Sequence, residues 1–277
     1  MITKQIAVLI ISITLVGVMF FLGNTKYPQQ KIKAIQQSLI TMQTLETESL
    51  QTLTAPQQKH WKHLTETLQK ATTDTAKIRA NDELFTFWGK DAKNDEIAVL
   101  YFAEKAKLEN SEKNITFAAN YILEDCITNS SDFVKTGFKA TVAKSLFEKA
   151  LAINPSNDSL NVGLGGCYIF GAGGSNPMEG ISKVLAVITK DSTNAYANKM
   201  LGYGNLQNGQ TDKALNRFIN AYNYNNNDVG LVPYIAMLSK KLGKLELANE
   251  WLQKAKVIFA NDPNLVQQIE NEFQSSK

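Results

Sequence analysis

Residues 209–221 read GQTDKALNRFINA, and residues 243–255 read GKLELANEWLQKA. The two stretches carry a glycine and then small and large apolar residues in the same register. Gly209, Ala214, Phe218 and Ala221 correspond to Gly243, Ala248, Leu252 and Ala255, each 34 positions later. The same phase extends back to Gly180, Val184 and Val187. A fixed period of this length predicts stacked helical hairpins that bury their apolar faces against one another.

An earlier copy of the pattern is present with a shifted phase. Ala143, Phe147, Ala150 and Pro155 have the spacing of a second helix and its exit turn. The offset from Ala143 to Gly180 is 37 positions, and Leu164-Gly165 precedes Leu201-Gly202 by the same distance. A three-residue insertion in the glycine-rich stretch 171–177 explains both shifts, so this stretch is predicted to be an extended helix–helix turn.

These motifs resemble the tetratricopeptide-repeat family over roughly residues 82–277, most specifically from Ala143 to Ala255. The resemblance implies an all-α solenoid of antiparallel helix pairs. A final helix from Pro263, with Leu265, Ile269 and Phe273 on one face, suits a capping helix. The chain departs from the family pattern at Gly180, where alanine is usual, and at Asn198 and Asn205, where large aromatic residues are common.

The resemblance also implies a binding surface. In this family the first helix of each repeat lines a groove that holds a peptide or a partner helix. The groove positions transferred onto this chain are Val162, Ile169, Tyr196, Lys199, Tyr203, Leu206, Met237 and Lys240. Tyrosine and methionine with lysine between them suit a protein or peptide ligand that is partly apolar and partly acidic.

The N-terminus has a different composition. Residues 6–23 carry no charge and are almost entirely apolar, and a helix of about 18 residues would span about 27 Å, close to the thickness of a bilayer core. The run exceeds the usual h-region of a signal peptide, and no small-x-small cleavage pattern follows it. We therefore expect a retained transmembrane anchor within residues 1–24. A short N-terminal flank before a long soluble part favours an extracytoplasmic, periplasmic location for the bulk of the chain.

Residues 25–80 are rich in Thr, Gln, Lys and Glu. Ile32, Ile35, Leu39 and Met42 have helical spacing, and Thr54 with Pro56 is typical of a helix start. One interpretation is a coiled-coil stalk that dimerises, and the other is one or two helices that pack on the repeats or hold them off the membrane. The predicted organisation is an anchor at 1–24, a helical stalk or linker at 25–80, and a helical repeat domain at 81–277.

The sequence shows no residue pattern that is typical of a catalytic, metal or nucleic-acid site. The net charge of +3 is small, and no Lys/Arg-rich run points to nucleic acid. Residues 171–174 lack the Gly-Lys-Ser/Thr ending of a phosphate-binding loop. His60 and His63 have no neighbouring acidic or thiol group at ligand spacing, and Cys126 and Cys167 are expected to be buried free thiols. We therefore predict no catalytic, cofactor or metal site.

The sequence favours a non-catalytic, membrane-anchored adaptor or scaffold that mediates protein–protein interaction. The plan of one anchor followed by repeats is similar to bacterial proteins that serve envelope protein assembly or cytochrome maturation. The alternative is a self-associating membrane organiser that dimerises through a coiled-coil stalk. An enzyme with an unrecognised active site is the third hypothesis.

Overall fold

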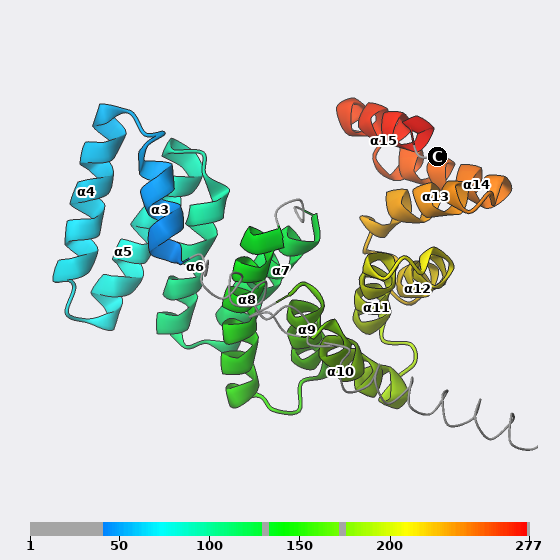
Figure 1. Ribbon diagram of the computed structural model, residues 1–277, viewed down its shortest axis with the longest axis horizontal. Coiled ribbons are helices and arrows are strands. Elements are labelled where there is room, and N and C mark those ends of the chain that lie inside the picture. The colour runs from blue at the N-terminus through cyan, green and yellow to red at the C-terminus, as the bar shows by residue number, and fades with distance from the viewer. Residues whose placement is uncertain (1–40, 129–132, 172–175, 276–277) are drawn as a thin grey trace, which may run out of the picture. The chain divides into compact units, whose positions relative to one another are not determined.

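The computed structural model describes residues 41–128, 133–171 and 176–275, and every regular element in them is a helix. The all-α prediction is therefore confirmed for this part of the chain. The elements, followed by colour in Figure 1, are α3 (Met42–Leu50), α4 (Ala55–Lys70), α5 (Asp74–Thr86), the π-helix η1 (Phe87–Asp91), α6 (Asp95–Glu109), α7 (Glu112–Thr128), α8 (Phe133–Ile153), α9 (Asp158–Ile169), α10 (Pro177–Lys190), α11 (Ala195–Gln207), α12 (Thr211–Tyr224), α13 (Leu231–Lys241), α14 (Leu245–Ile258) and α15 (Pro263–Ser275).

The expected transmembrane anchor at residues 6–23 lies outside the described residues, as does the first part of the expected stalk, 25–40. Among the helices from Met42 onward, none is both long enough and apolar enough to cross a membrane. The anchor therefore stays a prediction from sequence.

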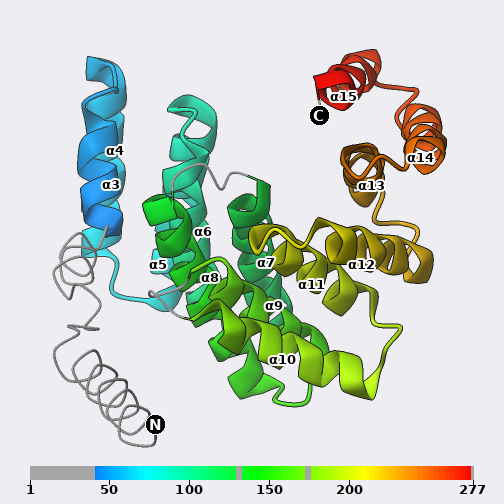
Figure 2. The ribbon, with the colours of Figure 1, turned by 45° about the vertical axis from the view of Figure 1, so that its right-hand side comes forward.

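Consecutive helices pack as hairpins. The most extensive packing joins α5 to α6, α7 to α8, α9 to α10, α11 to α12 and α13 to α14. Each hairpin also packs on the next, and the first helices α7, α9 and α11 contact one another in turn (Figures 1 and 2). The last helix, α15, packs on α13 and α14, in the position expected of a cap.

The repeat residues form the contacts that their spacing predicts. Phe147 and Phe218 are fully buried, and so are the small residues Ala143 and Ala214 one turn before them. Gly209 and Gly243 have φ of +69° and +71°, a conformation that favours glycine in the tight turns before α12 and α14. The chain between Ile169 and Pro177 joins α9 to α10, where the sequence placed the insertion.

Glycine in place of alanine at residue 180 has a direct structural reason. A Cβ added to Gly180 would lie 2.2 Å from the carbonyl oxygen of Gly165 on α9. The two helices approach more closely here than any side chain permits. The unusual Asn198 is equally well explained, since it is fully buried, donates to the carbonyls of Ser192 and Asn194, and accepts from Arg217.

The helices α3 and α4 belong to the same compact unit as the hairpins. α4 packs on α5, α3 packs on α6, and Leu45, Leu53 and Leu64 are buried in the common core. The start of α4 follows its sequence signals: Pro56 lies in the first turn, and the Thr54 amide donates to Gln57 Oε1 at 2.9 Å. The apolar side chains of residues 41–70 are thus used within the chain.

The apolar segment at the end of α5 runs on through Gly89. It continues to Asp91 as the π-helix η1. The wider turn lets two adjacent large residues, Phe87 and Trp88, both reach the core with 1% and 0% exposure. Their rings meet edge to face at 5.3 Å.

Two glycines on α11 give a matched test of this close packing. A Cβ at Gly202 would lie 2.4 Å from Cε1 of the buried Phe218, whereas a Cβ at Gly204 would have its nearest neighbour at 3.5 Å. We expect Gly202→Ala to destabilise the fold by about 1–3 kcal/mol because the ring must move. Gly204→Ala should be neutral or stabilising by up to about 1 kcal/mol, since alanine favours a helix. Urea unfolding of the full chain in detergent, followed by circular dichroism, measures both, and equal effects would contradict the packing.

Candidate functional site

The first helices of the hairpins converge where α9 is rich in glycine. A Cβ at Gly166 would lie 2.8 Å from the sulfur of Met200 on α11 and 2.9 Å from Cδ2 of Leu123 on α7. Side chains from α7 and α11 therefore both fill the space over Gly166, where α9 has no side chain. The surface made by α7, α9, α11 and α13 is called the first-helix face below.

Two polar contacts cross this face from α11 to α7. The hydroxyl of Tyr196 donates to Oδ1 of Asn120 at 3.1 Å, and Nζ of Lys199 donates to Oε1 of Glu124 at 2.9 Å. Lys199 also forms an ion pair with Asp228, in the segment before α13, at 3.2 Å. These five residues, the Lys199 brace, connect the α7–α8 hairpin, the α11–α12 hairpin and the segment that precedes α13.

The acidic partners of Lys199 stabilise its positive charge. Burial by itself disfavours the ammonium, but the attraction of Glu124 and Asp228 and their hydrogen bonds outweigh burial, so the pKa of Lys199 is raised above 10.5. The lysine side chain is only 12% exposed, whereas its acidic partners are 45% and 30% exposed. At neutral pH one enclosed ammonium therefore lies between two accessible carboxylates.

The eight residues expected in the groove have different surroundings. Val162 and Ile169 lie in the core, with 0% and 3% exposure. Tyr196 and Lys199 belong to the brace, and Tyr203 is buried with its ring 4.9 Å from that of Phe218.

The remaining three positions lie toward the C-terminal end of the domain. Leu206 and Met237 are half-buried. Nζ of Lys240 donates to the carbonyls of Phe273 and Gln274, at 2.5 and 3.1 Å, and lies 4.8 Å from the Phe273 ring centroid. Lys240 therefore caps the end of α15. Binding of a partner by the eight residues stays a prediction, and the structure shows that most of them already have partners within the chain.

Sequence reasoning missed an exposed group of aromatic rings. Phe117 and Tyr121 on α7 are 62% and 47% exposed. Both contact Phe102 on α6, at ring distances of 5.8 and 6.2 Å, and Phe102 contacts Phe85 on α5 at 5.3 Å. These four residues, Phe85, Phe102, Phe117 and Tyr121, are called the aromatic patch below.

A signal for the patch exists in the sequence of α7. The helix carries two apolar stripes, and only the one with Ile115 and Ile122 faces the core. Phe117 and Tyr121 form the second stripe, which continues to Glu124 at spacings of four and three residues. The acidic residue at the end of the second stripe marks it as the one that faces solvent.

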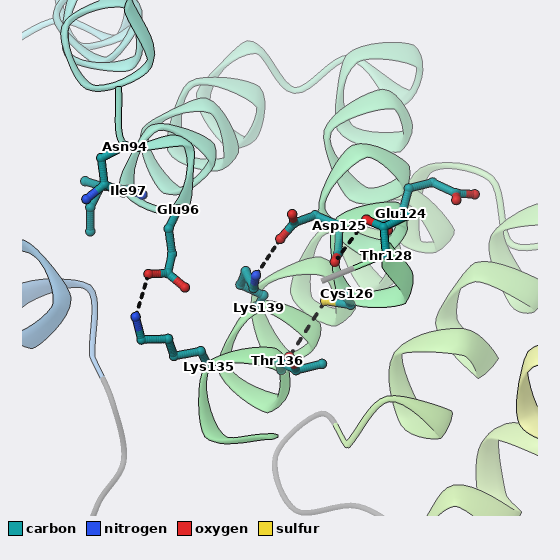
Figure 3. Close-up of polar contacts among 10 residues, drawn as sticks. All are labelled: Asn94, Glu96, Ile97, Glu124, Asp125, Cys126, Thr128, Lys135, Thr136 and Lys139. Atoms are coloured by element: carbon teal, nitrogen blue, oxygen red, sulfur yellow. Dashed lines mark hydrogen bonds and ion pairs between the residues drawn. The ribbon is translucent and has the colours of Figure 1, made fainter. Parts of the chain in front are cut away.

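The C-terminal end of α7 also carries a polar cluster that is separate from the Lys199 brace. Asp125 and Glu124 are adjacent but point to different sides, and Asp125 binds Nζ of Lys139 at 2.5 Å (Figure 3). The thiol of Cys126 donates to the carbonyl of Thr136 at 3.7 Å, and burial raises its pKa to about 12. Cys167 is also buried and free, and burial raises its pKa well above 9.0.

The described residues offer few candidate sites for a small molecule or a metal ion. An open pocket of about 470 Å³ lies among α3, α4, α5 and α6, but its Glu46 already accepts hydrogen bonds from Trp61 and Tyr101. Those residues contain no group of three or more His, Cys, Asp or Glu side chains that could hold a metal. His60 and His63 are exposed, and His60 lies 3.9 Å from Asp91.

Comparisons with known proteins add little to this geometry. No protein-family model and no curated protein sequence matches the chain. Among solved structures, the chain is similar to "MamA 41-end from Desulfovibrio magneticus RS-1", with 14% identity and a TM-score of 0.37. The match covers 68% of this chain and 97% of that one. The description of the fold therefore rests on the chain's own helices and their contacts.

Replacing Lys199 tests the brace. Lys199→Gln leaves Glu124 and Asp228 close together without a counter-charge, and we expect a loss of about 1–2 kcal/mol in the free energy of unfolding. A group with a raised pKa contributes stability below its unfolded-state pKa and loses it as the pH rises through the folded-state pKa, so the loss should be constant from roughly pH 6 to 9. Lys190→Gln, which removes an exposed pair with Asp158, is the control and should change stability by less than about 0.5 kcal/mol. Equal losses for the two variants would contradict the brace.

The two thiols should be unreactive in the folded chain. Burial keeps both protonated, so neither should react with a disulfide reagent at about pH 8, where an exposed thiol reacts readily. Both should react once guanidinium unfolds the chain, and the count of released thiolate measures this. Rapid reaction of either cysteine in the folded protein would show that α7 and α9 do not pack as described.

Proposed function

We propose that the protein is a non-catalytic scaffold of the tetratricopeptide-repeat type that binds another protein on its first-helix face. The observation that supports this most strongly is the aromatic patch. Phe117 and Tyr121 each expose about half or more of their surface on a rigid helix, although large aromatic residues are normally buried. Contiguous exposed apolar surface on a soluble domain typically marks a site of protein interaction.

The aromatic patch lies on tightly packed helices. The helices beneath it bury the side chains of Ile97, Ile115, Ala118 and Ile122 completely. Its rings contact one another in series from α5 to α7, so a partner would meet a preformed surface and lose little side-chain entropy on binding. Aromatic side chains on a rigid support are typical anchors of protein interfaces.

Tethering is a further part of the proposal. The uncharged run at residues 6–23 would hold the scaffold at a membrane, with the helical unit on the extracytoplasmic side. Self-association through a coiled-coil stalk is less well supported, because Leu45, Leu53 and Leu64 are buried against the chain's own helices. A role in envelope protein assembly or cytochrome maturation would agree with such a tethered scaffold.

Removing the patch tests the scaffold function. In the full chain, solubilised in detergent and used as bait, Phe117→Ser with Tyr121→Ser should abolish capture of a specific partner. Val257→Ser is the matched control, because Val257 is an apolar side chain on α14 with 77% exposure. Capture that is lost in the control too, or kept in the patch variant, would contradict the proposal. Sedimentation of the same samples measures self-association separately.

A further inference from the structure

An open pocket lies between α3 and the helices α4, α5 and α6. The helix α3 packs on α6, whereas α4 packs on α5, and a space of about 470 Å³ remains among the four helices. Pockets that hold small molecules in proteins typically measure about 300–1,000 Å³. Met42, Leu68 and Leu108 give this pocket an apolar part, and polar side chains line the rest of it.

One carboxylate in the pocket is oriented by neutral donors. Nε1 of Trp61 on α4 and the hydroxyl of Tyr101 on α6 donate to Glu46 on α3, at 2.8 and 2.6 Å, and both bonds end on the same oxygen, Oε1. Among the described residues, Glu46 has no cationic partner, and its second oxygen accepts no hydrogen bond. The chain therefore fixes the position of this carboxylate without neutralising its charge.

An ammonium from a different helix lines the same pocket. Lys77 on α5 is half-buried, and within the described part of the chain its Nζ forms no hydrogen bond and no ion pair. Glu104 on α6 also lines the pocket, but it is already paired with Lys107 at 2.7 Å. The pocket thus carries one uncompensated negative charge on α3 and one uncompensated positive charge on α5.

A nearly buried amide adds a neutral polar group to the pocket. Asn81 lies one turn after Lys77 on α5 and is only 4% exposed. Its Nδ2 donates to the carbonyl of Lys77 at 2.8 Å, which orients the side chain. The side-chain oxygen of Asn81 has no partner among the residues described, so it can accept a hydrogen bond from a ligand.

We propose that this cavity, the α3–α6 pocket, binds a small zwitterionic ligand with an apolar side chain, namely a free amino acid or a dipeptide. The ammonium of the ligand bonds to the free oxygen of Glu46, its carboxylate to Nζ of Lys77, and its side chain contacts Met42, Leu68 and Leu108. Hydrogen bonds between charged groups are stronger than those between neutral groups. This small-molecule site goes beyond the scaffold function and shares no residue with the aromatic patch.

The two unpaired charges of the pocket explain why the ligand must carry both signs. A simple amine pairs with Glu46 but leaves the half-buried Lys77 without a partner, and a simple acid does the reverse. A half-buried charge without a partner costs free energy, so each singly charged ligand is disfavoured relative to a zwitterion.

Matched peptides test the chemistry of the ligand. The probes are leucyl-leucine, its N-acetyl form, which has no ammonium, and its C-terminal amide, which has no carboxylate. Isothermal titration calorimetry with the full chain in detergent measures their binding. Leucyl-leucine should bind with a Kd below about 1 mM, and each blocked form should bind at least about 10-fold more weakly. Free leucine, titrated in the same way, distinguishes an amino acid from a dipeptide as the ligand.

Variants of the two charged residues locate the binding. Glu46→Gln keeps an acceptor oxygen for Trp61 and Tyr101, and Lys77→Gln removes an ammonium that has no partner, so both variants should keep the fold, which circular dichroism verifies. Each should weaken leucyl-leucine at least about 10-fold. Glu46→Gln should also abolish the preference for leucyl-leucine over its N-acetyl form, and Lys77→Gln the preference over its amide.

Exposed residues on neighbouring helices supply matched controls. Glu48→Gln on α3 and Lys62→Gln on α4 make the same changes in charge outside the pocket, and each should change binding less than about twofold. No binding of leucyl-leucine at millimolar concentration, equal binding of the three peptides, or equal effects of Glu46→Gln and Glu48→Gln would each overturn the inference. Capture of a partner protein by the aromatic patch is measured separately and does not depend on these outcomes.

Discussion

Two adjacent glycines of α9, Gly165 and Gly166, are the constraint on which the first-helix face depends. Gly165 lets α10 approach to the point where no Cβ fits at Gly180, and Gly166 leaves room for Leu123 and Met200 to meet. Because α9 has no side chain at Gly166, side chains of α7 and α11 come within reach of each other although they belong to different hairpins. The contact between Lys199 and Glu124, 75 residues apart in the chain, follows from this closeness.

The close approach of α7 and α11 reduces the number of side chains that the first-helix face can offer to a partner. Val162 and Ile169 are buried, and Lys199 and Lys240 have partners within the chain. The chain pairs Lys199 and Lys240 internally and leaves the carboxylates of Glu124 and Asp228 partly accessible. Apolar surface remains on α7, beside the acidic end of the brace. Function on this face therefore depends on the groups that the internal contacts leave unpaired.

The fold was largely predictable from sequence, because the repeat residues act locally. Ala143 with Phe147 and Ala214 with Phe218 have the spacing of one helix face, and Gly209 and Gly243 mark turns that require a positive φ. The continuation of α5 into a π-helix was not predictable, since it depends on Phe87 and Trp88 both finding space in the core. The candidate site was harder to predict than the fold. Positions transferred from the family indicate which helix lines the groove, but not which side chains contact one another across it. The pairing of Lys199 with Glu124 depends on three helices at once.

The most direct test of this account is a double-mutant cycle between Lys199 and Glu124 in the full chain. Unfolding free energies of Lys199→Gln, Glu124→Gln and the double variant give the coupling between the two side chains without assigning a value to either alone. Residues so far apart in sequence couple only if α7 and α11 meet over α9. The account predicts a favourable coupling of at least about 0.5 kcal/mol. Strictly additive effects would contradict it.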